Sequence, residues 1–120
     1  MSIYSVHSTA FYKEVAQNCC LWTIRDESGF PAPFNNDGKR AQPFWSSKSR
    51  VERIIANVEA YSGFEPVELK LQIFLERWIP GLTKDGILIG VNWSGNSATG
   101  FDISPSQVAE NILVQMQKKT

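Results

Sequence analysis

Few residues of this chain have the types and spacing that enzymatic chemistry needs. His7 is the only histidine, so neither a Ser–His–Asp triad nor a multi-histidine metal site can be completed with a second one, and we expect His7 to be solvated. Ser46, Ser47 and Ser49 cluster, but neither a GxSxG nor an SxxK motif accompanies them. We interpret Ser49 as a helix cap. The sequence therefore assigns no catalytic residue.

Glycines and carboxylates do not add a recognisable site. Five glycines of the second half match neither a phosphate-binding loop nor a dinucleotide-binding loop, so we predict that they serve turns and close packing, and we expect no cofactor. They are Gly81, Gly86, Gly90, Gly95 and Gly100. Two carboxylate pairs, Glu65 with Glu68 and Asp85 with Asp102, are interpreted as solvated acids, because Asp and Glu are seldom buried.

The two cysteines, Cys19 and Cys20, are adjacent in the chain. A disulfide between neighbouring residues is strained, and two cysteines cannot complete a four-ligand zinc site. We expect both to be reduced thiols in a reducing compartment, with no metal bound.

One segment, residues 39–53, is more basic than the rest of the chain. Its five cations face a single acid, Glu52, and Phe44 and Trp45 lie between them, an arrangement that single-stranded nucleic acid could use through stacking and phosphate contacts. The cations are Lys39, Arg40, Lys48, Arg50 and Arg53. The whole chain carries twelve basic and twelve acidic residues, so it has no global attraction for nucleic acid. We therefore favour the other interpretation, in which Phe44 lies in the core and the cations are solvated.

The candidate functional surface lies where an apolar strand, expected at residues 87–93, gives way to polar residues. Ligand sites in sheets with parallel strands gather beyond the carboxyl ends of the strands, and Gly95 permits a tight turn there. The alternative is a solvated loop with Trp93 folded back on the core. With Trp45 and Arg50 added, the candidate interaction or ligand surface comprises Asn92, Trp93, Ser94, Asn96, Trp45 and Arg50.

The elements that must position these residues centre on a helix followed by that strand. Apolar residues at helical spacing predict a helix ahead of the strand, with Trp78 buried in mid-stripe. They are Leu71, Phe74, Leu75, Trp78, Ile79 and Leu82. Pro80 lacks an N–H, so the helix should kink or stop near Ile79.

The remaining patterns predict a single α+β domain over residues 1–120. We expect a mixed sheet in which an N-terminal antiparallel meander precedes alternating helices and strands, with helices packed on the sheet. Ser49 with Glu52, and Ser104 with Pro105, are typical of helix starts. The meander strands are 20–26, 30–34 and 40–46; a strand at 66–70 and a strand or extended lead-in at 99–103 follow; helices are expected at 5–18, from 49 and from 105.

The chain resembles the bacterial domain-of-unknown-function family 2750 over nearly its whole length. The resemblance is carried by residues 22–29, by Asp37-Gly38 leading to residues 43–45, by residues 64–66 and most specifically by residues 74–82 running into Asp85-Gly86. It implies a compact α+β fold in a bacterial cytoplasm. It implies no reaction, so no catalytic residue is carried over.

Composition and motifs together favour a binding function. We expect a non-enzymatic protein-interaction module, of adaptor or toxin-immunity type, with a protein partner and with a homodimer left open. The alternative is a small-molecule-binding protein or an enzyme with a pocket at the end of strand 87–93, and a second alternative is single-stranded nucleic-acid binding through residues 39–53. No run reaches the ~20 apolar residues of a membrane span, so we expect no membrane partner and a cytoplasmic location.

Overall fold

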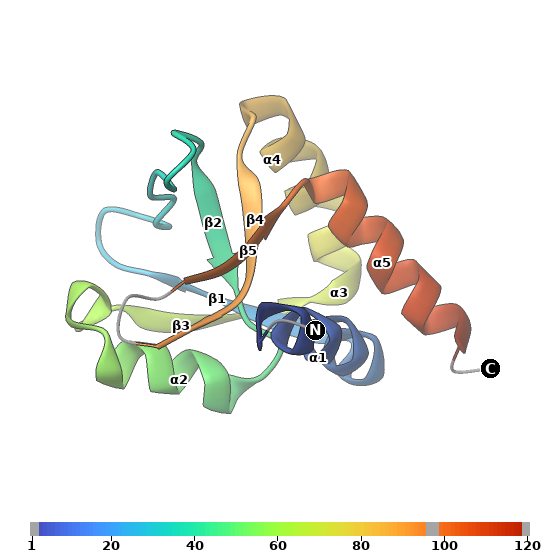
Figure 1. Cartoon of the computed structure of the whole chain (residues 1–120), viewed down its shortest axis with the longest axis horizontal. Coiled ribbons are helices and arrows are strands. Elements are labelled where there is room, and N and C mark those ends of the chain that lie inside the picture. The colour runs from blue at the N-terminus through green and yellow to red at the C-terminus, as the bar shows by residue number, and fades with distance from the viewer. Residues whose placement is uncertain (1–2, 96–98, 119–120) are drawn as a thin grey trace.

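The computed structural model describes residues 3–95 and 99–118, apart from the side chains of residues 3–7 and Thr99, and its class is α+β. Helices and strands alternate along most of the chain (Figure 1). Their bounds are α1 (Ile3–Asn18), β1 (Cys20–Arg25), β2 (Ala41–Phe44), α2 (Lys48–Asn57), the 3-10 turn η1 (Glu59–Tyr61), β3 (Glu65–Lys70), α3 (Leu71–Ile73), the π-helical segment η2 (Phe74–Trp78), α4 (Ile79–Asp85), β4 (Leu88–Ser94), β5 (Thr99–Ile103) and α5 (Pro105–Lys118).

The strands form two sheets. In the larger one β4 lies between β2, to which it is parallel, and β5, to which it is antiparallel. The smaller sheet is an antiparallel pair of β1 and β3. The expected mixed sheet is therefore confirmed, with β4 at its centre, and residues 99–103 are a strand rather than a lead-in.

The N-terminal part of the sheet differs from the expected meander. β1 pairs with β3, and a bridge in which Trp22 and Trp45 exchange two backbone hydrogen bonds of 2.7 Å each joins β1 to the residue that follows β2. The Thr23 hydroxyl of β1 also donates a hydrogen bond of 2.9 Å to the backbone oxygen of Pro43 in β2. Residues 30–34 form no strand and make a single bridge, from Phe34 to Arg40. Pro31 and Pro33 have no N–H to donate to a ladder, and this explains why the pairing stops there.

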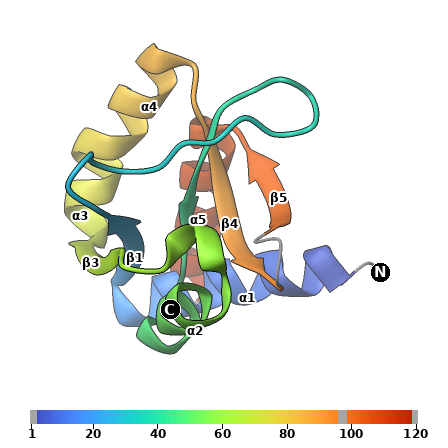
Figure 2. The same ribbon diagram turned by 90° about the vertical axis from the view of Figure 1, so that its left-hand side faces the viewer.

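The larger sheet is covered on both faces. One core cluster joins β4 to α1, α5 and the helical segment 71–85, whereas a second joins β2 and β4 to α2. In the turned view of Figure 2, β4 runs through the middle of the molecule and α2 lies near the end at which β4 finishes. The last residue of β2 and the residue that follows it supply different clusters, because side chains alternate along an extended chain: Phe44 enters the first cluster and Trp45 the second.

The helix ahead of β4 is longer than Pro80 suggested. The chain stays helical from Leu71 to Asp85 and passes through a π-helical stretch that ends at Trp78, so the loss of the proline N–H coincides with a change of helical geometry rather than an end. Gly86 then ends the helix with φ at +69°. Trp78 is partly rather than fully buried: it packs against the first core cluster, and its ring makes T-shaped contacts with Phe30 and Phe44.

Two helix starts test the capping patterns. The cap of α2 is Ser47, not Ser49: the Ser47 hydroxyl accepts a hydrogen bond of 3.3 Å from the N–H of Arg50. At α5 the Ser104 hydroxyl accepts one of 3.3 Å from the N–H of Gln107, as expected.

Over residues 3–95 and 99–118, no helix is both long enough and apolar enough to cross a membrane.

Candidate binding site

A cavity of about 210 Å³ opens between α2 and the end of β4, and we call it the α2–β4 cavity. Five of the six residues of the candidate surface line it, although they come from three separate segments of the chain. The sixth, Asn96, lies outside the described residues. Among the residues that the structure describes, the lining comprises Trp45, Arg50, Arg53, Ile54, Asn57, Asn92, Trp93, Ser94 and Gly95.

The floor of the cavity is formed by buried side chains. Trp45 is fully buried, and Ile54 and Trp93 are 4% and 6% exposed. The indole N–H of Trp45 donates to the backbone oxygen of Trp93 at 2.8 Å, and that of Trp93 donates to Asp102 Oδ1 at 2.9 Å. Because both N–H groups already have partners, the floor presents apolar ring surface to an occupant.

A β-bulge places Trp93 on this side of the sheet. By strict alternation Trp93 would share the face of Ile89 and Val91, which belong to the first core cluster, yet it belongs to the second. The pairing register of β4 with β5 shifts between Val91 and Ser94, and Asn92 has φ at +48°. The extra residue turns the indole onto the face of Gly90 and α2. Without the bulge the cavity would lack half of its aromatic floor.

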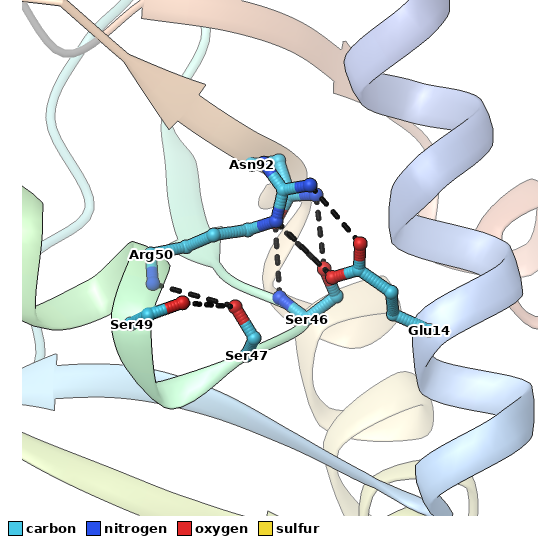
Figure 3. Close-up of polar contacts among 6 residues, drawn as sticks. All are labelled: Glu14, Ser46, Ser47, Ser49, Arg50 and Asn92. Atoms are coloured by element: carbon cyan, nitrogen blue, oxygen red, sulfur yellow. Dashed lines mark hydrogen bonds and ion pairs between the residues drawn. The ribbon is translucent and has the colours of Figure 1, made fainter.

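The side chain of Asn92 holds the bulge against the segment that follows β2. Its Oδ1 accepts a hydrogen bond of 2.9 Å from the N–H of Ser46, and its Nδ2 donates to the Ser46 hydroxyl at 3.0 Å. That hydroxyl donates in turn to Glu14 Oε1 at 2.6 Å (Figure 3). Asn92 and Ser46 are both buried, so these bonds compensate for the loss of solvent.

Arg50 and Glu14 form a two-bond ion pair that joins α2 to α1 at the edge of the cavity (Figure 3). Arg50 Nε lies 3.1 Å from Oε1 of Glu14, and Nη2 lies 3.0 Å from Oε2. The hydrogen bond from Arg50 lowers the pKa of the Glu14 carboxyl most, the Ser46 hydroxyl and the charge of Arg50 lower it further, and partial burial opposes them. Glu14 therefore stays ionised and holds Arg50 in place.

The rim of the cavity is basic. Arg50 and Arg53 both line it, together with the exposed side chain of Asn57. No carboxylate contributes to the lining, and Arg53 has no ion-pair partner within residues 3–95 and 99–118. The cavity thus combines an apolar floor with two guanidinium groups at its opening, of which, among the described residues, Arg50 is paired with Glu14 and Arg53 is not.

The structure bears on the nucleic-acid alternative as well. Phe44 and Trp45 are both buried, Trp45 at the floor of the α2–β4 cavity, so neither ring lies on an open surface on which successive bases could stack. The basic segment is also divided: Lys39 and Arg40 precede β2, whereas the other three cations follow it. Both cysteines are free, and the described part of the chain contains no group of three or more His, Cys, Asp and Glu side chains that could hold a metal.

Comparison with known proteins identifies the family. A family model with the description "Protein of unknown function (DUF2750)" matches residues 8–112. The chain belongs to this family. No curated protein matches the chain. Among solved structures, Anabaena Tic22, a protein of protein transport, is similar over 75% of this chain at 12% identity with a TM-score of 0.41, and the match spans 46% of that protein's chain.

The candidate surface predicted from the sequence left out several parts of the site that this DUF2750 chain assembles, although Ser46 and Arg53 were considered there for other roles. Glu14 and Ser46 support the lining residues, and Ile54, Arg53 and Asn57 line the cavity themselves. The α2 members could have been found from Arg50, since residues 50, 53, 54 and 57 lie at helical spacing on one face. Glu14 could not, because its contacts with Ser46 and Arg50 depend on the packing of α1.

Proposed function

We propose that this protein is a protein-interaction module whose binding site is the α2–β4 cavity, and that a partner protein inserts one anchoring residue there. The observation that carries the proposal is the composition of the cavity: two buried indoles and Ile54 beneath a rim of two guanidinium groups. Adaptor and immunity roles both require such a partner.

The size of the cavity supports a single side chain as its occupant. Sites for drug-sized ligands and cofactors usually measure ~300–1,000 Å³, whereas this cavity measures about 210 Å³. Protein interfaces draw much of their affinity from a few residues that fill well-packed pockets. A pocket of this volume therefore suits an anchor residue better than a whole metabolite.

Several side chains that line the cavity are fixed by hydrogen bonds inside the protein, and this favours a binding site over a catalytic one. Each indole N–H of the floor, the side chain of Asn92 and the Arg50 guanidinium are held by hydrogen bonds inside the protein. Such side chains lose little further freedom when an occupant enters, and this lowers the entropic cost of binding. A rigid pocket with few exposed polar groups is typical of a recognition site.

A small anionic molecule is the second candidate, because the basic rim would attract one. Its binding would not require a protein surface around the cavity.

We further propose a cytoplasmic location, supported by the two free cysteines, which are stable in a reducing compartment.

The proposal is tested by blocking the cavity mouth. Asn57 and Ala56 are both exposed and adjacent at the end of α2, but only Asn57 lines the cavity. In affinity capture from a lysate of the native cells, we expect the wild-type protein and Ala56→Trp to retain the same partner and Asn57→Trp to lose it. Matching thermal unfolding curves for the two variants would show that both fold. Retention of the partner by Asn57→Trp would contradict the proposal.

A further inference from the structure

We infer that the residue bound in the α2–β4 cavity is the C-terminal residue of the partner chain, with an apolar side chain on the indole floor and its free carboxylate between Arg50 and Arg53. This inference rests on the proposed function and names the chemistry of the anchor. It follows from where the cavity is apolar, where it is charged and which cationic N–H groups remain available.

Apolar surface and charge are separated by depth. The three floor residues are almost fully buried, whereas Arg53 is exposed and the side chain of Arg50 is 28% exposed. A complementary occupant must place its apolar part on the floor and its negative charge at the opening. Burying the charge on the indole floor instead would cost desolvation energy that no cation there repays.

Both rim cations have donors to spare. Glu14 occupies Nε and Nη2 of Arg50, and Nη1 donates no hydrogen bond to any residue that the structure describes. Arg53 has neither an ion pair nor a side-chain hydrogen bond within the same residues. Two guanidinium groups one helical turn apart can share one carboxylate, the anion whose planar shape their forked donors fit.

The C-terminal residue of a chain fits an apolar floor with cations at the opening better than an internal acidic residue does. In a C-terminal residue the carboxylate and the side chain leave the same Cα, so the side chain can enter while the carboxylate stays at the rim. In an internal Asp or Glu the carboxylate is the tip of the side chain and would reach the apolar floor. Capture of C-terminal carboxylates is a known mode of peptide recognition.

The experiment compares three short peptides of equal length. The first ends in Leu with a free carboxylate, the second is the same peptide amidated, and the third carries an internal Glu and an amidated end. The readout is the NMR shift of the indole N–H resonances of Trp45 and Trp93, the floor of the cavity. We expect the free acid to bind about tenfold or more tightly than either amidated peptide, because charge-assisted hydrogen bonds are lost.

Charge variants identify the cations. Arg53→Gln should abolish the preference for the free acid and leave the weak binding of the amide unchanged. Arg77→Gln is the matched control, since Arg77 is also exposed but lies in η2, away from the cavity. Equal binding of acid and amide, or tightest binding of the internal Glu peptide, would overturn the C-terminal anchor.

The same measurements separate this inference from the proposed function. If all three peptides fail to shift the indole resonances while Asn57→Trp still loses the captured partner, the cavity is a protein site but the anchor is not a C-terminal residue. If the free acid binds with the expected preference, the anchor is supported, and the partner is then to be sought among proteins with apolar C-termini.

Discussion

The indole of Trp93 covers Gly90 so closely that a Cβ on Gly90 would overlap the ring. The two residues lie on the same face of β4 only because the bulge at Asn92 shifts the alternation by one position. This contact positions the Trp93 part of the cavity floor, and it is possible because residue 90 has no side chain. Gly100 contributes similarly from β5, with its Cβ position 3.0 Å from Trp93 Cδ1.

Adding a methyl group at Gly90 should therefore displace Trp93. We expect Gly90→Ala to lower the free energy of unfolding by about 1–3 kcal/mol, as overpacking of a core does. Gly81→Ala is the control: nothing lies within 4 Å of its Cβ position, and it is inside α4. It should stabilise the protein by roughly 0.5–1 kcal/mol. Denaturant unfolding measures both, and equal effects would contradict the contact.

The stability of the protein should depend on the ionisation of Glu14. Its pKa is lower in the folded protein than the ordinary value of 4.5, so its contribution is present above that value and is lost as the pH falls through the lower folded pKa. Glu14→Gln should thus weaken the acid dependence of stability measured by urea unfolding. At neutral pH we expect a loss of about 1 kcal/mol or less, because the pair is partly solvated.

A second ion pair provides the comparison for Glu14. Arg25 and Glu65 lie 3.0 Å apart, but their side chains are 52% and 65% exposed. We expect Glu65→Gln to change stability by less than about 0.5 kcal/mol. If Glu65→Gln weakens the acid dependence of stability more than Glu14→Gln does, the Glu14–Arg50 pair is not the main source of that dependence.

The bulge predicts an unusual order of variants at residue 92. Asn92→Ala and Asn92→Gly both remove the hydrogen bonds to Ser46, but only glycine adopts positive φ without strain. Both should destabilise the protein, and Asn92→Gly should be the more stable of the two by roughly 1 kcal/mol. Thermal or denaturant unfolding decides. If Asn92→Ala is the more stable, residue 92 does not occupy the left-handed region.

Replacing a fully buried and a partly buried tryptophan with alanine should lower the stability by different amounts. Trp45 is fully buried and bonded to Trp93, so Trp45→Ala should cost about 3–5 kcal/mol. Trp78 is half-buried, and we expect Trp78→Ala to cost roughly 1–2 kcal/mol. Equal losses in denaturant titrations would place Trp78 in the core after all.

Burial also changes which substitutions can test the binding site. Asn92 and Trp93 are 1% and 6% exposed, so replacing both with alanine should unfold much of the protein rather than remove binding alone. Such a double variant would therefore lose folding and binding together and could not separate the two. Rim residues such as Arg53 and Asn57 are the appropriate probes.

Local patterns in the sequence predicted most of the secondary structure and the position of the candidate surface. Helical spacing revealed the segment that begins at Leu71, the Ser104-Pro105 pair marked the start of α5, and continuous apolar residues marked β4. The change from apolar to polar residues at Asn92 pointed to the end of that strand. These signals are local, because they depend on residues within one or two turns of each other.

How those elements meet depends on contacts between residues that are far apart in the chain. Glu14 and Arg50 are 36 residues apart in the chain, and Ser46 and Asn92 are 46 apart. No local pattern encodes such pairs, since each depends on the packing of two elements against a common core. The face on which Trp93 lies is a further case: it depends on one residue with positive φ, and a shift of one residue moves every following side chain of a strand to the opposite face.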